Sequence, residues 1–211
     1  MFRNREEAGT LLAGKLKKFS HQDGIVLAVP RGGIPVAYVV ARELGMPLDL
    51  VLTKKIGHPQ NKEYAIGAVS PTDYFVISHE DVTENYILEE IRKIRIRLKQ
   101  MQYRFTGGDV QESVEGKTVI IIDDGMATGN TLMSTVHMLR KAKPAKIVVA
   151  VPVASASAVK KLSEEADEVI AHFIPWNFQG VGAYYEDFHQ VSDEEVIYFL
   201  DKFKNEIKKI A

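Results

Sequence analysis

Short apolar stretches of strand length alternate with helical patterns along most of this chain. The expected strands cover residues 24–30, 48–53, 118–122, 147–151 and 168–173. The expected helices cover residues 6–19, 34–44, 131–143 and 155–166, with a further helix opened by the capping box of Ser192 and Glu195. Continuous apolar strands are buried on both faces of a sheet. The alternation therefore predicts an α/β fold with a parallel sheet flanked by helices.

The middle of the chain departs from this alternation. Residues 54–63 are polar and predict a mobile loop, and two short apolar runs at 65–69 and 74–77 flank a turn signal and predict a hairpin. Residues 83–105 predict a long helix. Its apolar stripe consists of Ile87, Leu88, Ile91, Ile94, Leu98 and Met101. We expect one domain over residues 1–211, with an insertion at about 64–108 and a small C-terminal hood at about 174–190.

Composition excludes several classes of protein. Hydrophobic residues make up 45% of the 211 residues, which is too many for a disordered chain, and the net charge of −1 argues against nucleic-acid binding by bulk electrostatics. The absence of cysteine excludes disulfides, thiolate zinc sites and iron–sulfur clusters. The longest apolar run, residues 147–154, is far shorter than the roughly 20 residues of a membrane helix. The charged N-terminal segment shows no secretory signal. We expect a cytoplasmic protein without a membrane partner.

The segment VIIIDDGMATGNT, residues 119–131, carries the most chemical information. A buried strand ends in Asp123 and Asp124, at the carboxyl edge where open α/β sheets bind ligands. A loop of small residues follows, in which backbone N–H groups can converge in front of a helix N-terminus and bind a phosphate group. Carboxylates beside such a loop suit the hydroxyls of a ribose that carries the phosphate. The lysine and glycine spacing of a P-loop is missing.

A plainer interpretation is a strand followed by an ordinary helix N-terminus that Asp124 caps. An adjacent pair of acids alone would favour that interpretation. Here the apolar strand, the two acids, the small-residue loop and the following helix occur together, which favours a ligand site.

With these residues the chain resembles the type I phosphoribosyltransferases. Their signature is four apolar residues, two acids, two apolar residues and a small Thr-Gly loop, and the segments RGGIPVA and KKIGHPQNKEYAIGAV add to the similarity. One difference is Gly125, which stands where the family usually has a bulkier apolar residue. The resemblance implies a phosphoribosyltransferase-like sheet as the core of the fold.

The resemblance also implies a substrate and a cofactor, phosphoribosyl pyrophosphate with Mg²⁺. Asp123 and Asp124 would hold the ribose hydroxyls as catalytic residues, and would bind the metal directly or through ribose and water. The 5′-phosphate would lie on the loop and the helix start. This set consists of Gly125, Ala127, Thr128, Gly129, Asn130 and Thr131.

Two further segments match where the family binds pyrophosphate. Arg31, Gly32 and Gly33 correspond to its pyrophosphate loop, which often contains a strained peptide. The other interpretation of Arg31 is an ordinary surface arginine. Lys54 and Lys55 resemble a basic pair that contacts pyrophosphate, and Lys55 would act in catalysis by stabilising the charge of the leaving group. A solvated charge pair is the other interpretation. The loop of residues 58–64 is then a candidate lid, with His58 as a weaker acid or base candidate.

The acceptor is expected near the hood. Trp176 and Phe178 could stack on a planar base, or the hood aromatics could form a small core of their own. Features of hypoxanthine-type enzymes are missing, because Ala127 replaces an acid, Ala183 replaces a metal-binding aspartate, and residues 151–155 lack a lysine. We therefore do not expect a 6-oxopurine acceptor.

The resemblance implies a transferase, specifically a glycosyltransferase (pentosyltransferase) of nucleoside metabolism and nucleotide salvage. It would transfer the phosphoribosyl group to a nitrogenous acceptor such as a nucleobase, and a homodimer is one expected assembly. The alternative is a non-catalytic regulatory protein that binds phosphoribosyl pyrophosphate. A hydrolase with Asp123 as nucleophile would need a downstream lysine motif that we do not find.

A basic face on the long helix could contact nucleic acid. It consists of Arg92, Lys93, Arg95, Arg97, Lys99 and Arg104. Three glutamates upstream, at positions 84, 89 and 90, balance these charges, so the face reads as a solvated helix surface and we expect no nucleic-acid partner.

Overall fold

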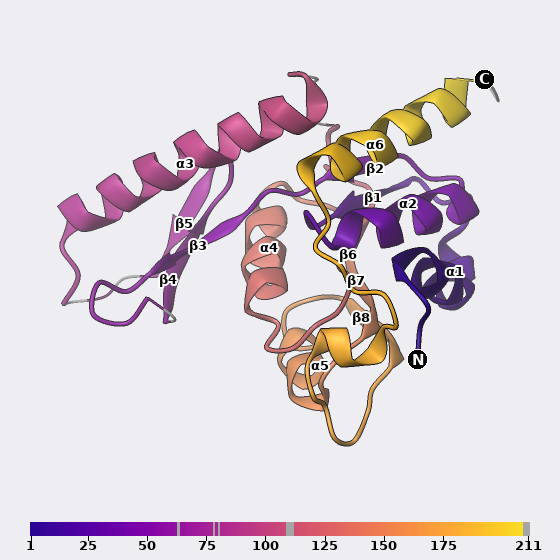
Figure 1. Ribbon diagram of the computed structural model, residues 1–211. Coiled ribbons are helices and arrows are strands. Elements are labelled where there is room, and N and C mark those ends of the chain that lie inside the picture. Colours follow the sequence, from indigo (N-terminus) through magenta and orange to yellow (C-terminus); the bar gives the residue numbers. More distant parts are fainter. Residues whose placement is uncertain (63, 78, 80, 109–111, 209–211) are drawn as a thin grey trace.

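The computed structural model describes residues 1–62, 64–77, 79, 81–108 and 112–208 (Figure 1). The α-helices are α1 (Arg5–Leu16), α2 (Gly33–Leu44), α3 (Glu84–Thr106), α4 (Asn130–Lys141), α5 (Ala156–Leu162) and α6 (Asp193–Lys208). The strands are β1 (Gly24–Ala28), β2 (Leu48–Leu50), β3 (Lys54–Gly57), β4 (Ala65–Val69), β5 (Tyr74–Val76), β6 (Thr118–Ile122), β7 (Lys146–Val153) and β8 (Glu168–Phe173). Two short 3₁₀ helices are η1 (Lys17–Phe19) and η2 (Val181–Tyr184).

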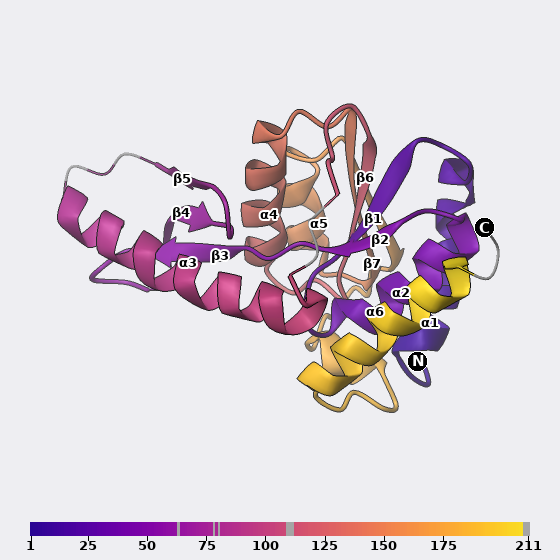
Figure 2. The ribbon, with the colours of Figure 1, turned by 90° about the horizontal axis from the view of Figure 1, so that it is seen from above.

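A five-stranded parallel sheet in the order β2-β1-β6-β7-β8 forms the core. Successive side chains of a strand point to opposite faces. In β6, Ile120 and Ile122 pack in the cluster that contains α1, α2 and α6, whereas Val119 and Ile121 pack in the cluster that contains α4 and α5. Helices therefore cover both faces (Figure 2), which confirms the fold class predicted from the alternation.

An arm formed by β3, β4, β5 and α3, residues 54–106, projects from the core (Figure 1). Its strands form an antiparallel sheet in the order β3-β4-β5, and α3 packs on this sheet through Ile91, Ile94 and Leu98. The prediction of a loop at residues 54–63 was wrong at its start, because Lys54–Gly57 is a strand paired with β4. Residue 63, in the expected lid, lies outside the described residues. Leu88 was wrongly placed in the buried stripe and is 51% exposed.

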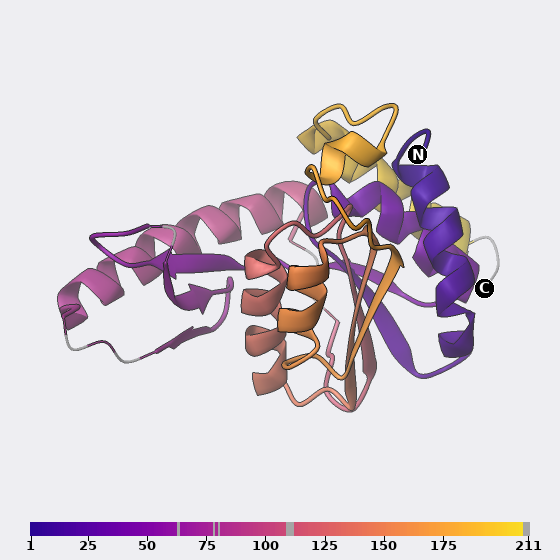
Figure 3. The ribbon, with the colours of Figure 1, turned by 90° about the horizontal axis from the view of Figure 1, so that it is seen from below.

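Residues 174–190, the hood, follow β8 and lie at the carboxyl edge of the sheet. Backbone hydrogen bonds join the hood to the start of the chain, from Phe2 N to Tyr184 O and from Glu186 N to Phe2 O, each 2.8 Å long. The N-terminus therefore lies beside the hood (Figure 3). After the hood, Ser192 and Glu195 form the predicted capping box, since each side chain accepts the other residue's backbone N–H. No helix in the described part of the chain has the length and apolarity needed to cross a membrane.

The two faces of β6 make the central strand sensitive to loss of volume. We expect Ile120→Ala, at a fully buried position, to lower the free energy of unfolding by about 2–5 kcal/mol, because the cavity cannot collapse between two layers of helices. Ile96→Ala on α3, where the side chain is 49% exposed, is the matched control and should change little. Urea unfolding of both variants measures the difference, and equal losses would contradict this assignment of the core.

Candidate functional site

Asp123 and Asp124, the acid pair, directly follow the central strand β6. Because the sheet is parallel, the segment after β1, the segment after β7 and the hood after β8 meet the pair at the same edge. The backbone N–H of Asp124 donates to Asp123 Oδ1 at 2.9 Å. The sequence prediction that two acids stand at the carboxyl edge of a buried strand is thus confirmed by the position of β6.

Gly32 and Gly33, at the start of α2, lie directly against the acid pair. A Cβ on Gly32 would lie 2.1 Å from Asp124 Oδ2, and one on Gly33 would lie 2.6 Å from the carbonyl oxygen of Ile122. A side chain at position 33 would overlap the backbone, and one at position 32 would displace the Asp124 carboxylate. The peptide bond between Pro30 and Arg31, just before these glycines, is cis.

Arg5, the first residue of α1, is the cation of the site. Its Nε and Nη2 both lie 2.9 Å from Asp124 Oδ2, and the residue is 6% exposed. Asp123 has no such partner among the described residues. Burial raises the pKa of the Asp123 carboxyl well above its usual range, and the charge of Asp124 raises it further. Burial also raises the pKa of the Asp124 carboxyl, while Arg5 opposes that rise.

Two carboxylate oxygens of the acid pair are left for a ligand. Asp123 Oδ2 and Asp124 Oδ1 accept no hydrogen bond from any other described residue, since Asp123 Oδ1 binds a backbone N–H and Asp124 Oδ2 binds Arg5. Carboxylate oxygens that are free to accept suit neighbouring hydroxyl groups.

The small-residue loop runs from Gly125 to Gly129 and leads into α4. Met126 anchors it, because its N–H donates to Val153 O at 2.8 Å and its side chain is buried. Gly129 is the N-cap of α4 and has a φ of 74°, which favours glycine. The N–H groups of Ala127 and Thr128 donate to no acceptor in the described part of the chain. Together with the N-terminus of α4, they can bind an anion.

The hood closes the loop from the other side. A Cβ on Gly125 would lie 2.4 Å from Val181 Cγ1, so the hood residue occupies the space of the bulkier family residue. The Tyr185 hydroxyl donates to the carbonyl oxygen of Asp124 at 2.7 Å, and burial raises the pKa of that hydroxyl.

The remaining basic residues named from the sequence come from other parts of the structure than the acid pair. Arg31 Nε lies 2.6 Å from Asp193 Oδ1 at the start of α6, and its side chain is 39% exposed. Lys54 and Lys55 lie on β3, in the sheet of the arm and not in the sheet that ends at the acid pair. His58 is buried in the arm, with its Nε2 3.1 Å from Asp81 Oδ2.

The two hood aromatics named from the sequence differ in their surroundings. Phe178 stacks on Tyr184 with ring centroids 5.8 Å apart, inside the small apolar cluster of the hood. Trp176 is 99% exposed.

A metal ion at the acid pair would need ligand atoms beyond those that the described residues offer. Among the described residues, no group of three or more His, Asp or Glu side chains could hold one. Mg²⁺ is commonly held by one or two carboxylates together with phosphate groups of a substrate. The two open oxygens of the acid pair fit that limited contribution.

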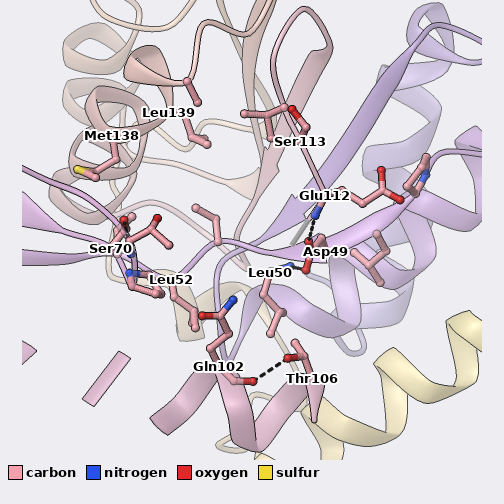
Figure 4. A pocket seen from close by; sticks show the side chains of 18 of the residues that line it. Asp49, Leu50, Leu52, Ser70, Gln102, Thr106, Glu112, Ser113, Met138 and Leu139 are labelled. Carbon is pink, nitrogen blue, oxygen red and sulfur yellow. Dashed lines mark hydrogen bonds between the residues drawn. The ribbon is translucent and has the colours of Figure 1, made fainter. Parts of the chain in front are cut away.

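A cavity of about 980 Å³ lies away from the acid pair, between the edge strand β2, the arm and the end of α4 (Figure 4). Met138 and Leu139 line it, so it is at the opposite end of α4 from the loop. Both oxygens of Asp49 within it accept backbone N–H groups, from Leu50 at 2.7 Å and Glu112 at 3.1 Å. Both oxygens of this carboxylate are therefore already hydrogen-bonded within the protein.

Sequence reasoning missed Arg5 and the hydrogen bond made by Tyr185. Arg5 stands in a charged N-terminal segment that is typical of a solvated helix start, and 119 positions separate it from Asp124. No local pattern signals such a contact. Tyr185 lies in the hood, but the partner of its hydroxyl depends on the tertiary structure.

Contact between loop and hood can be tested at Gly125. Gly125→Ala should lower the free energy of unfolding by about 1–3 kcal/mol, because the new Cβ overlaps Val181. Adding Val181→Ala removes both clashing carbons and should restore most of the loss. Gly14→Ala in α1, where a Cβ meets no atom within 4 Å, is the control and should be neutral or stabilising. Failure of Val181→Ala to rescue would contradict the contact.

His189 links the hood to α6. Its Nε2 lies 3.0 Å from Glu195 Oε1 and its Nδ1 lies 2.8 Å from Asp187 Oδ1. Hydrogen bonds to Glu195 and then to Asp187 raise the pKa of the imidazole above its ordinary value.

A raised pKa in the folded state stabilises the fold below the ordinary histidine value of about 6.5, and this contribution is lost as pH rises through the folded pKa. We expect the difference in the free energy of unfolding between wild type and His189→Gln to become smaller as the pH rises through the folded pKa of His189. Unfolding by urea at a series of pH values measures it. A difference independent of pH would show that His189 is not charged in the fold.

Comparisons with known proteins agree with this geometry. Residues 4–187 match the family described as the phosphoribosyl transferase domain. A Mycobacterium tuberculosis protein whose name assigns it to the phosphoribosyl transferases is 35% identical over 207 residues, which are 96% of this chain and 47% of that protein. The chain thus spans about half the length of this relative. An amidophosphoribosyltransferase of Rhizobium etli is 27% identical over 120 residues, 56% of this chain and 18% of that enzyme.

The fold is shared over nearly the whole chain with a solved structure. The crystal structure of the protein TT1426 from Thermus thermophilus has a TM-score of 0.89 and 38% sequence identity, and the match covers 96% of this chain and 98% of that one. Since the family match includes the central sheet, the acid pair and most of the hood, the chain belongs to the phosphoribosyl transferase domain family.

Proposed function

We propose that the protein transfers the 5-phosphoribosyl group from phosphoribosyl pyrophosphate to a nitrogenous acceptor, with release of pyrophosphate. The observation that carries this proposal is the pair of open oxygens, Asp123 Oδ2 and Asp124 Oδ1, next to a loop with N–H groups that have no acceptor among the described residues. The oxygens would accept from the two ribose hydroxyls. Gly125, Ala127 to Thr131 and the start of α4 would bind the 5′-phosphate.

In this reaction the bond between the anomeric carbon and the pyrophosphate oxygen breaks with its electron pair, and the acceptor nitrogen forms a bond to that carbon and then loses its proton. Positive charge develops on the sugar, so both acids stabilise the transition state. Arg31, Gly32, Gly33, Lys54 and Lys55 would face the pyrophosphate, and Lys55 would stabilise its developing charge. Bound Mg²⁺ would neutralise phosphate oxygens, with Asp123 and Asp124 as its protein ligands, directly or through water.

We assign residues 1–211 to one catalytic domain in which the loop of residues 58–64, on the arm, acts as the lid and the hood, with Trp176 and Phe178, faces the acceptor. The reacting carbon must be shielded from water while charge develops, and the arm carries both candidate lysines. The exposure of Trp176 supports its availability for stacking on a planar group.

The alternative is a regulatory protein that binds phosphoribosyl pyrophosphate without turnover. The packing of Phe178 against Tyr184 favours it, since that ring is occupied inside the hood. Acceptor-dependent release of pyrophosphate, measured with a panel of nucleobases, separates the two. Tight binding without release for any acceptor would favour the regulatory protein.

The acid pair provides the decisive binding test. Asp123→Asn and Asp124→Asn should each weaken binding of phosphoribosyl pyrophosphate with Mg²⁺ at least about tenfold, because a neutral amide is a poorer acceptor for hydroxyls. Asp201→Asn, at an exposed position on α6, is the control and should bind like the wild type. Calorimetry measures affinity, and unchanged binding by both acid-pair variants would refute the proposed site.

A further inference from the structure

The guanidinium of Arg5 makes more contacts than its ion pair with Asp124. Nη1 donates to the carbonyl oxygen of His189 at 2.9 Å, and Cζ lies 4.0 Å from the ring centroid of Phe188. Both residues belong to the hood. A single side chain thus joins the first helix, the acid pair and the hood, and it is almost completely buried at this junction.

The ion pair is selective for one oxygen of Asp124. Nε and Nη2 both bind Oδ2, and the backbone of Gly32 lies against the same oxygen, since a Cβ there would come within 2.1 Å of it. The Tyr185 hydroxyl holds the main-chain carbonyl of Asp124. The carboxylate is therefore fixed at Oδ2, and Oδ1 is the oxygen left to accept from a ligand.

The hood and the start of the chain are tied together around this contact. Phe2 forms backbone hydrogen bonds with Tyr184 and Glu186, and Asp187 N donates to Arg3 O at 2.9 Å. Arg5 follows two residues after this paired segment. Any movement of the hood therefore moves Arg5 or breaks its bond to His189.

We propose that Arg5 is a positioning residue that holds Asp124 with Oδ1 facing a sugar hydroxyl and fastens the hood beside that oxygen. This inference rests on the proposed function, because it assumes that the acid pair binds a ribose. It assigns to Arg5 no contact with the ligand. The effect of Arg5 should therefore depend on the hydroxyl groups of the ligand and not on its phosphate group.

The test compares two phosphate monoesters, ribose 5-phosphate and methyl phosphate, by calorimetry. Wild type should bind ribose 5-phosphate more tightly, and Arg5→Met should reduce the ratio of the two affinities about tenfold while methyl phosphate binding stays the same. Arg5→Lys keeps the charge but cannot place two N–H groups on Oδ2 and a third on His189, so it should restore only part of the ratio. Arg3→Met, whose side chain is exposed and pairs with Glu7, should match the wild type.

Hydrogen exchange at the amides of Glu186 and Asp187 adds a readout without ligand. Exchange should accelerate in Arg5→Met, because the hood loses its bond to Arg5, and should stay slow in Arg3→Met. If Arg5→Met does not fold, Arg5→Lys carries both measurements.

The outcomes separate the two proposals. An unchanged affinity ratio in folded Arg5 variants, or an equal loss for both ligands, overturns the role of Arg5 while leaving the acid pair in place. A wild type that does not prefer ribose 5-phosphate over methyl phosphate overturns the proposed function, and the role of Arg5 with it.

Discussion

Burying two carboxylates side by side opposes folding, since each loses its hydration and each repels the other. Asp123 and Asp124 stand in this position at the end of the central strand, and among the described residues Arg5 is the one cation that pairs with them. A single cation offsets a single charge. The pair is therefore unequal before any ligand arrives, with Asp124 anchored by a charged partner and Asp123 held by one backbone N–H.

Three distant segments converge on Asp124, the carboxylate with the charged partner. Arg5 comes from the first helix, Gly32 from the segment after β1, and Tyr185 from the hood. Glycine is required at position 32 because the carboxylate already fills the space of a side chain. The contact between Val181 and Gly125 is of the same kind, since the hood packs tightly where the loop has no side chain.

The parts of the structure that the sequence predicts are those with local causes. The strand at residues 118–122 was predicted with the same limits that the structure shows. A short continuous apolar run that ends at two acids is typical of a buried strand. Ser192 and Glu195 likewise form a capping box from residues three positions apart.

The parts that the sequence did not predict depend on distant partners. Strand β3 has one buried residue, Ile56, among polar residues. The hydrophobic periodicity of this segment therefore does not indicate a strand that pairs with β4. The contact of Arg5 with Asp124 joins residues from opposite halves of the chain. Leu88 faces outward because it lies about 100° round the helix from Ile87, which packs against the cluster of the arm.

The proposed site is divided between the central sheet, the arm and the hood. The acid pair and the loop before α4 belong to the central sheet, whose core includes both of its faces. Lys54 and Lys55 belong to the arm, which has a separate apolar cluster. Trp176 and Phe178 belong to the hood, whose apolar cluster also includes Phe2, Ala8 of α1 and Val153 of β7. Sub-structures with their own cores can shift relative to one another at less cost than a central sheet can deform. If the acid pair binds the ribose phosphate as proposed, that binding and the arrangement of the leaving group by the arm would be separable steps, and Arg5 would couple the first of them to the hood.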